Sequence, residues 1–205
     1  MFLTRLLLDS RSSQARRDLA NACEMHRTLV RAFVCGPDDV PERFLWRLET
    51  DGDAHRPPAL LLQSSSAGRW AELENLPGYL HSVEAKQLDL ERFVVAGRRF
   101  SFRLLANPNV TRQGKRRALL DEPAQHEWLQ RQGQRHGFIL LGCAIAPQAP
   151  VQGPRNHHAE LCIHRVRYDG VLQVADKAAL RAALLAGIGA GKAVGCGMLS
   201  LKPIT

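Results

Sequence analysis

One of the histidines in the first half of the chain, His26, has neighbours suited to chemistry on a phosphate. The surrounding pattern predicts a helix, and helical spacing puts His26 next to Cys23 and Arg27 next to Arg31. An imidazole titrates near neutral pH, and a guanidinium carries a fixed positive charge that pairs with phosphate oxygens. A lone histidine on a helix is more often structural, so a packing role stays the alternative at this point.

The carboxylates and cysteines do not form a pattern typical of a metal site. Near His26, the residues Asp9, Asp18 and Glu24 lack the clustering of a magnesium site, so any phosphodiester cleavage is expected to need no metal. The five cysteines include no CxxC pair, which argues against a disulfide framework or a zinc ribbon. The densest group of metal-ligand residue types is interpreted as a loop followed by a strand: His157, His158, Cys162 and His164. We therefore expect neither a metal nor another cofactor.

A glycine-rich stretch, GIGAGKAVGCG at residues 187–197, lies late in the chain. It departs from a P-loop because Ala193 follows Lys192 and because position 186 is an alanine. It also follows a predicted helix and precedes a strand, which is the reverse of a dinucleotide-binding turn. Glycine backbone can approach a phosphodiester closely, so we favour a phosphate contact over a mere helix end and turn. The residues assigned to that contact are Gly187, Gly189, Gly191, Lys192 and Gly195.

Two further segments of the second half concentrate positive charge. The stretches at residues 111–117 (TRQGKRR) and 154–158 (PRNHH) predict cationic loops that contact phosphates, with plain solvated loops as the alternative. On a nearby predicted strand, Phe100 and Phe102 are assigned to the core, and Arg103 points the other way. The nucleic-acid-binding candidates from these segments are Arg103, Arg112, Lys115, Arg116, Arg117, Arg155, His157 and His158.

The 205-residue chain has a formal net charge of +8, and the whole excess lies in its second half. Residues 1–97 carry 12 Lys and Arg against 14 Asp and Glu, whereas residues 98–205 carry 16 against 6. This asymmetry favours a polyanionic partner, nucleic acid before a membrane, with plain solubility as the alternative. No apolar run approaches the roughly 20 residues of a membrane helix, and the opening segment is too short for a secretory signal. We expect a cytoplasmic protein.

The hydrophobic patterns of residues 1–95 predict a domain with the order strand, helix, strand, strand, helix, strand. Asn21 and Glu24 form a capping box at the start of the helix that carries His26, and Gly36-Pro37 is expected to end that helix. The other elements are expected as strands at 2–8, 44–48, 59–63 and 79–86 and a short helix at 67–76.

Residues 98–205 repeat the same order, around a basic loop at 107–117. A hairpin is predicted to turn at Asp169-Gly170, and Asp176 is predicted to cap a helix. Two consecutive βαββαβ units predict an α+β chain of two tandem ferredoxin-like domains, the topology of RNA-recognition-motif domains. We assign the catalytic histidine to the first domain and the basic and glycine-rich loops to the second. The elements expected here are strands at 99–104, 138–146, 159–168, 171–175 and 197–202 and helices at 122–136 and 177–186.

Four segments together resemble the CasE family, the CRISPR RNA-processing endoribonucleases of the type I-E system. They are RRDLANACEMHRTLVRAF, FLWRLE, RRFSFRLLANPNVTRQGKR and GIGAGKAVGCGMLSL, and they follow the family's order over nearly the whole chain. The resemblance implies two ferredoxin-like domains and metal-independent cleavage of the precursor transcript just 3′ of the repeat hairpin. It also implies that the enzyme stays bound to the mature CRISPR RNA and joins the other subunits of the Cascade complex, away from membranes.

The resemblance also assigns roles to individual residues. The family's active-site histidine falls on His26, its basic helix position on Arg31, and its companion tyrosine on Cys23, which is a departure because a thiol is shorter and forms weaker hydrogen bonds. The glycine-rich loop maps onto residues 187–197, and the hairpin that grips the RNA stem maps near 155–158. The implied reaction is attack of the 2′-hydroxyl on the adjacent phosphate, with His26 as general base or general acid. Arg27, Arg31 or the glycine-loop amides would stabilise the phosphorane.

Two other functions stay open from the sequence. The departure at Cys23 is compatible with a non-catalytic subunit of the same complex that binds the hairpin without cutting it. An unrelated ferredoxin-like regulatory protein, whose positive charge serves solubility alone, is the third hypothesis.

Overall fold

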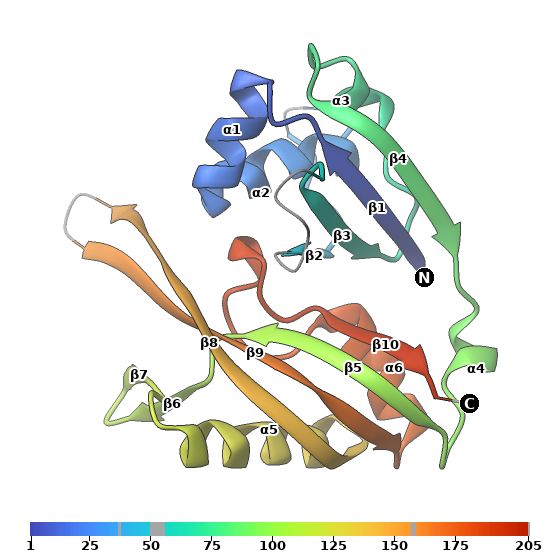
Figure 1. Cartoon of the computed structure of the whole chain (residues 1–205), viewed down its shortest axis with the longest axis vertical. Coiled ribbons are helices and arrows are strands. Elements are labelled where there is room, and N and C mark those ends of the chain that lie inside the picture. The colour runs from blue at the N-terminus through green and yellow to red at the C-terminus, as the bar shows by residue number, and fades with distance from the viewer. Residues whose placement is uncertain (37, 50–55, 157–158, 205) are drawn as a thin grey trace. The chain divides into compact units, whose positions relative to one another are not determined.

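The computed structural model describes residues 1–36, 38–49, 56–156 and 159–204 (Figure 1). The chain divides into two compact units, each described here by itself. The first holds Met1–Asp89 together with Ala193–Gly195, and the second holds Leu90–Lys192 together with Cys196–Thr205. Among the described helices, none combines the length and the apolar character that a membrane span requires.

The first unit is a four-stranded antiparallel sheet with strand order β2-β3-β1-β4. Leu6 and Leu8 of the first strand are fully buried and pack in one core with Met25 and Leu29 from the helix that carries His26. The core thus ties that helix to the centre of the sheet. The elements are β1 (Phe2–Leu8), α1 (Ser13–Ala20), α2 (Ala22–Val30), the 3₁₀ turn η1 (Arg31–Phe33), β2 (Phe44–Glu49), β3 (Ala59–Ser64), α3 (Ala71–Glu74) and β4 (Leu80–Gln87).

The helical region after β1 is interrupted, which the sequence pattern does not predict. Asn21 has extended backbone between α1 and α2, and its side chain accepts hydrogen bonds from the backbone N–H groups of Cys23 and Glu24. The predicted N-cap at Asn21 is therefore confirmed. The other half of the predicted capping box is wrong, because the Asn21 backbone N–H donates to the carbonyls of α1 and the Glu24 carboxylate pairs with arginines instead. The regular helix ends at Val30 and continues as η1, while Pro37 lies outside the described residues. The predicted helix at 67–76 is shortened to α3.

The second unit repeats this topology in a sheet of order β10-β5-β9-β8. In both units the strand order is that of a ferredoxin-like fold, so the predicted α+β fold with two tandem ferredoxin-like domains is confirmed. The predicted helix at 122–136 and the cap at Asp176 are also confirmed. The elements are α4 (Leu90–Phe93), β5 (Arg99–Ala106), β6 (Asn109–Arg112), β7 (Lys115–Ala118), α5 (Glu122–His136), β8 (Phe138–Asn156), β9 (Ala159–Val174), α6 (Lys177–Ala186), η2 (Lys192–Val194) and β10 (Leu199–Pro203).

The predicted turn at Asp169-Gly170 is wrong, because both residues lie inside the continuous strand β9. Asp169 serves as an ion-pair partner there, 2.6 Å from Arg103 Nε and 2.9 Å from Arg167 Nε. Gly170 is required by close backbone approach: a Cβ on it would lie 2.1 Å from the carbonyl oxygen of Gly142, next to a bulge in β8. β8 and β9 themselves form the long hairpin, paired out to Asn156 and Ala159.

The predicted basic loop at 107–117 is instead mostly a two-stranded hairpin, β6 and β7. Gln113 and Gly114 have φ angles of +50° and +73°, which is the pattern of a tight two-residue hairpin turn. A glutamine in this conformation and strands without apolar alternation explain why the pattern predicts a loop.

Candidate active site and nucleic-acid interface

His26 is packed into the first unit on an aromatic surface. Its ring stacks on Phe44 of β2, with 5.2 Å between ring centroids and 27° between the planes, and Phe44 in turn stacks on Phe33. Burial lowers the pKa of His26 below its ordinary value, so the imidazole is neutral at neutral pH. Nδ1 is buried and has no hydrogen bond within the described residues. Protein atoms thus enclose one ring nitrogen, and a neutral imidazole can take up a proton at the other.

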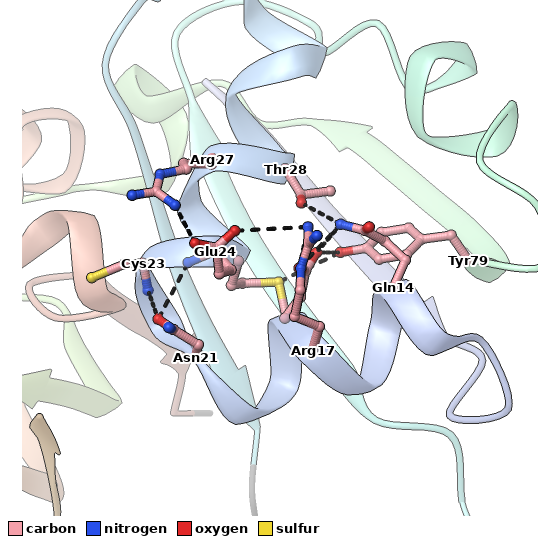
Figure 2. A network of polar contacts seen from close by, with 10 residues as sticks. Gln14, Arg17, Asn21, Cys23, Glu24, Arg27, Thr28 and Tyr79 are labelled. Atoms are coloured by element: carbon pink, nitrogen blue, oxygen red, sulfur yellow. Dashed lines mark hydrogen bonds and ion pairs between the residues drawn. The ribbon is translucent and has the colours of Figure 1, made fainter. Parts of the chain in front are cut away.

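The two arginines near His26 differ in how much of their charge is available. Arg27, 72% exposed, forms a close ion pair with Glu24 on the same helix, and Arg17 approaches Glu24 from α1 at 3.7 Å. Figure 2 shows Arg27 and Arg17 converging on Glu24. Arg31 is exposed on η1 and makes no ion pair within the described residues. Of the two predicted cations, Arg31 is therefore the better placed to meet a phosphate.

Cys23 lies in the first turn of α2, one turn before His26. Its backbone N–H donates to Asn21 Oδ1 at 2.9 Å, and its thiol is directed away from that capping side chain in Figure 2. The thiol is half-buried and makes no hydrogen bond to any residue that the structure describes. Within the described residues, the hydrogen bonding of Cys23 is therefore that of a backbone group at the start of a helix.

A buried polar network fixes α1 against α2 (Figure 2). The Asp18 carboxylate is fully buried and accepts hydrogen bonds from the Tyr79 hydroxyl at 2.9 Å and from Gln14 Nε2 at 3.1 Å. The same Gln14 amide donates to Thr28 Oγ1 at 3.1 Å, two residues beyond His26. Burial, with the Asp18 charge next to it, raises the pKa of Tyr79 well above its ordinary range. The Gln14–Thr28 bond joins this network of α1 to α2, the helix that carries His26.

The glycines of residues 187–197 each have a positive φ angle, between +75° and +92°. This backbone conformation is one that residues with a side chain rarely adopt, and it explains why the segment holds so many glycines. Lys192 closes the turn by donating from Nζ to the Gly189 carbonyl at 2.6 Å. Gly195 is buried, and a Cβ there would lie 3.1 Å from the Trp46 ring, so packing accounts for this glycine.

Part of the glycine loop lines a cavity of about 650 Å³ within the second unit. The loop contributes Gly187, Gly189, Ala190, Gly191 and Lys192, the hairpin contributes Asn109 and Arg116, and α5 contributes Trp128, Gln132, Arg135 and His136. Among the described residues, none with an acidic side chain lines this cavity. Burial, together with the charges of Arg135 and Lys192, lowers the pKa of His136. The cavity is a cationic site suited to a phosphate-bearing ligand.

The structure gathers only some of the predicted nucleic-acid-binding residues. Arg116, Lys192 and three of the glycines line the cavity, and the exposed Arg112, Lys115 and Arg117 lie on the same hairpin. Arg103 lies elsewhere, ion-paired with Asp169 in a separate hollow of about 440 Å³ that Lys202 also lines. The predicted loop at 154–158 is wrong where the structure describes it, because β8, with Arg155, extends to Asn156. His157 and His158 lie outside the described residues.

Sequence reasoning missed the face of α5 that lines the cavity. Trp128, Gln132, Arg135 and His136 recur at the spacing of one helical face, and this periodicity is the signal that would have found them. Among cysteines and histidines, Cys162 Sγ lies 3.8 Å from His164 Nε2 on β9. No group of three metal-ligating side chains lies together in the part of the chain that the structure describes.

Comparisons with known proteins cover the whole chain. A family model described as CRISPR associated protein matches residues 1–203. The chain is 36% identical over 216 residues to the CRISPR-associated endoribonuclease Cse3 of Thermus thermophilus, covering 99% of this chain and 100% of that protein. It is similar to a structure of Cse3 bound to a 19-nucleotide RNA, with a TM-score of 0.89, 35% identity and coverage of 99% and 100%. It is also similar to a chain of a CRISPR RNA-guided surveillance complex in a pre-nicking state, with a TM-score of 0.72, 30% identity and full coverage of both chains.

Proposed function

Because this chain belongs to the CasE family of CRISPR-associated endoribonucleases, to which Cse3 belongs, we propose that it cleaves the CRISPR precursor transcript 3′ of the repeat hairpin. It stays on the mature CRISPR RNA and acts in the cytoplasm with the other subunits of Cascade. The observation that carries the proposal is the full-length likeness to Cse3, whose structure has been solved with bound RNA. The likeness to a chain of a surveillance complex supports the assembly with other subunits.

Cleavage uses the 2′-hydroxyl next to the scissile phosphate as an internal nucleophile, so no activated water is needed. O2′ forms a bond to phosphorus, the bond from phosphorus to O5′ breaks, and the products are a 2′,3′-cyclic phosphate and a 5′-hydroxyl. One proton leaves O2′ and one arrives at O5′. The lowered pKa of His26 supports the general-base role, in which neutral Nε2 takes the proton from O2′.

The developing charge on the phosphorane needs a cation that is not already neutralised. Arg31 meets this requirement better than Arg27, whose guanidinium is paired with Glu24. Cys23 replaces the family's tyrosine, and its thiol has a shorter reach and supplies at most a weak hydrogen bond. We assign the chemistry to His26 and Arg31, with Arg27 and Cys23 in lesser roles.

RNA binding is assigned to the second unit, in keeping with a catalytic domain at residues 1–95 and a binding domain at 98–205. The exposed arginines and lysine of the β6–β7 hairpin contact phosphates along the stem, and the cationic cavity supplies a second group of contacts. Such contacts release counterions, so affinity falls as salt rises. The same contacts hold the product after cleavage.

The test is incubation of the full chain with a labelled repeat RNA in EDTA, using the repeat of the CRISPR array beside the gene. Cleavage just 3′ of the stem is expected, and a 2′-deoxy substitution at the cut site should abolish it while leaving affinity nearly unchanged. Cleavage of the deoxy RNA would contradict the mechanism. Cys23→Tyr measures whether the family's phenol raises the cleavage rate above that of the natural thiol.

The departure at Cys23 favours one alternative, a subunit that binds the hairpin without cutting it. Salt-dependent binding with no cleavage in the same experiment would support this alternative over the endoribonuclease. The absence of salt-dependent binding would contradict both functions and favour the third hypothesis, an unrelated ferredoxin-like regulatory protein.

A further inference from the structure

The cavity of the second unit is larger than a backbone contact requires. Its volume of about 650 Å³ lies within the roughly 300–1,000 Å³ range of small-molecule pockets. The phosphates of an RNA stem lie on the outside of the helix, where exposed arginines on a hairpin reach them without a pocket. A cavity of this size fits a group that projects from the stem.

The two arginines of the cavity are available to a ligand. Arg116 and Arg135 come from two different elements, and neither makes an ion pair within the described residues. Lys192 is tied to the loop by its bond to the Gly189 carbonyl and adds a third positive charge to the wall. Because no carboxylate of the described residues lines the wall, this excess of positive charge favours a phosphate between the cations.

The same wall carries two amide side chains, which a phosphate does not need. Asn109 donates from Nδ2 to the Asn107 carbonyl at 2.9 Å, which fixes the orientation of the amide and leaves Oδ1 as an acceptor. Gln132 lines the cavity from α5, one turn before His136, and its side chain has no hydrogen bond within the described residues. Amides of this kind read the edges of nucleobases, because they present a donor and an acceptor together.

We infer that the cavity takes one unpaired nucleotide, turned out of the repeat hairpin or its single-stranded flank. The phosphate lies among Arg116, Arg135 and Lys192, and the base meets the amides of Asn109 and Gln132. Unpaired bases are what proteins read most often in RNA. The inference rests on the proposed function and adds to it a sequence preference at a single nucleotide.

The test is an abasic scan of the repeat RNA, in which each unpaired nucleotide in turn loses its base. Affinities are measured with the full chain carrying His26→Ala, so that the bound RNA stays intact. Gln132→Leu removes the amide from the wall, and Gln134→Leu, an exposed position on the same helix that does not line the cavity, is the matched control.

One abasic position is expected to weaken binding about tenfold, as the loss of one base contact does. In Gln132→Leu this penalty should fall below about threefold, whereas Gln134→Leu should keep it. Asn109→Ala provides a second variant with the same expectation, should Gln132→Leu fail to fold by its melting curve.

Two results would overturn the inference. In one, no abasic position matters, and the cavity holds backbone phosphate alone. In the other, the sensitive position is equally sensitive in the cavity variants, and the base is read elsewhere. Both leave hairpin binding and cleavage by the unsubstituted chain intact, so they are distinct from failure of the proposed function, in which the chain neither binds nor cuts the unmodified RNA.

Discussion

Removing the hydroxyl of Tyr79 tests the network that fixes α2. The hydroxyl donates at 2.9 Å to the carboxylate of Asp18, a side chain with no exposed surface, so no water can replace the donor. A hydrogen bond to a charged group contributes about 1.5–3 kcal/mol. Gln14 and Arg17 continue to contact the carboxylate after the substitution, so Tyr79→Phe is expected to lower the free energy of unfolding by about 2 kcal/mol.

Tyr168→Phe provides the matched control in the second unit. Tyr168 is equally buried, but its hydroxyl donates to a neutral acceptor, the Gln125 carbonyl, at 3.3 Å. A bond of that kind contributes about 0.5–1.5 kcal/mol. The two variants therefore remove the same atom from buried tyrosines and differ in the charge of the acceptor.

Urea unfolding followed by circular dichroism measures the difference. With a denaturant slope of about 2 kcal/mol per molar, Tyr79→Phe should lower the midpoint of its transition by about 1 M, and Tyr168→Phe by about half as much. Equal shifts, or a larger shift for Tyr168→Phe, would refute the view that a buried charge makes the Tyr79 bond the stronger one.

Three further predictions concern the proposed chemistry. The single-turnover cleavage rate should rise with pH through the lowered pKa of His26 and level off by neutral pH, because His26 acts as a base only when its imidazole is neutral. A rate that falls over this pH range would indicate that His26 acts as a general acid. Arg31→Gln should slow cleavage about 100-fold and Arg27→Gln less than about threefold, because only Arg27 is paired with a carboxylate, and equal losses would contradict this order. RNA affinity should rise as pH falls below neutral, as His136 gains a proton and adds a charge to the cavity; His136→Asn should remove that part of the pH dependence in binding titrations.

Local signals predicted those elements whose cause lies within a few residues. Asn21 caps α2 and Asp176 caps α6 through their own side chains, so these helix starts are readable from sequence. The course of β9 depends instead on Gly142 and Arg103, which are distant in the chain from Gly170 and Asp169. Asp-Gly is a strong local turn signal, and these tertiary contacts override it.

The features of the candidate site also divide into those that local sequence patterns predict and those that depend on contacts between distant segments. The resemblance to the CasE family is confirmed, while the residue roles that it assigns remain predictions. The pairing of Arg27 with Glu24 follows from helical spacing and was within reach of the sequence. The stacking of His26 on Phe44, and the cavity between α5 and the glycine loop, join segments that no local pattern connects.

The pairing of β10 with β5 has a consequence for synthesis of the chain. Leu199 lies opposite Leu104, so almost half of the sequence is synthesised after β5 before its partner β10 is made. On the ribosome the hairpin of β8 and β9 can form first, since its strands are neighbours in sequence, and the far edge of β5 stays open until β10 emerges. An open edge invites pairing with other chains. Ribosome stalling or truncation before residue 199 should therefore yield aggregates through β5.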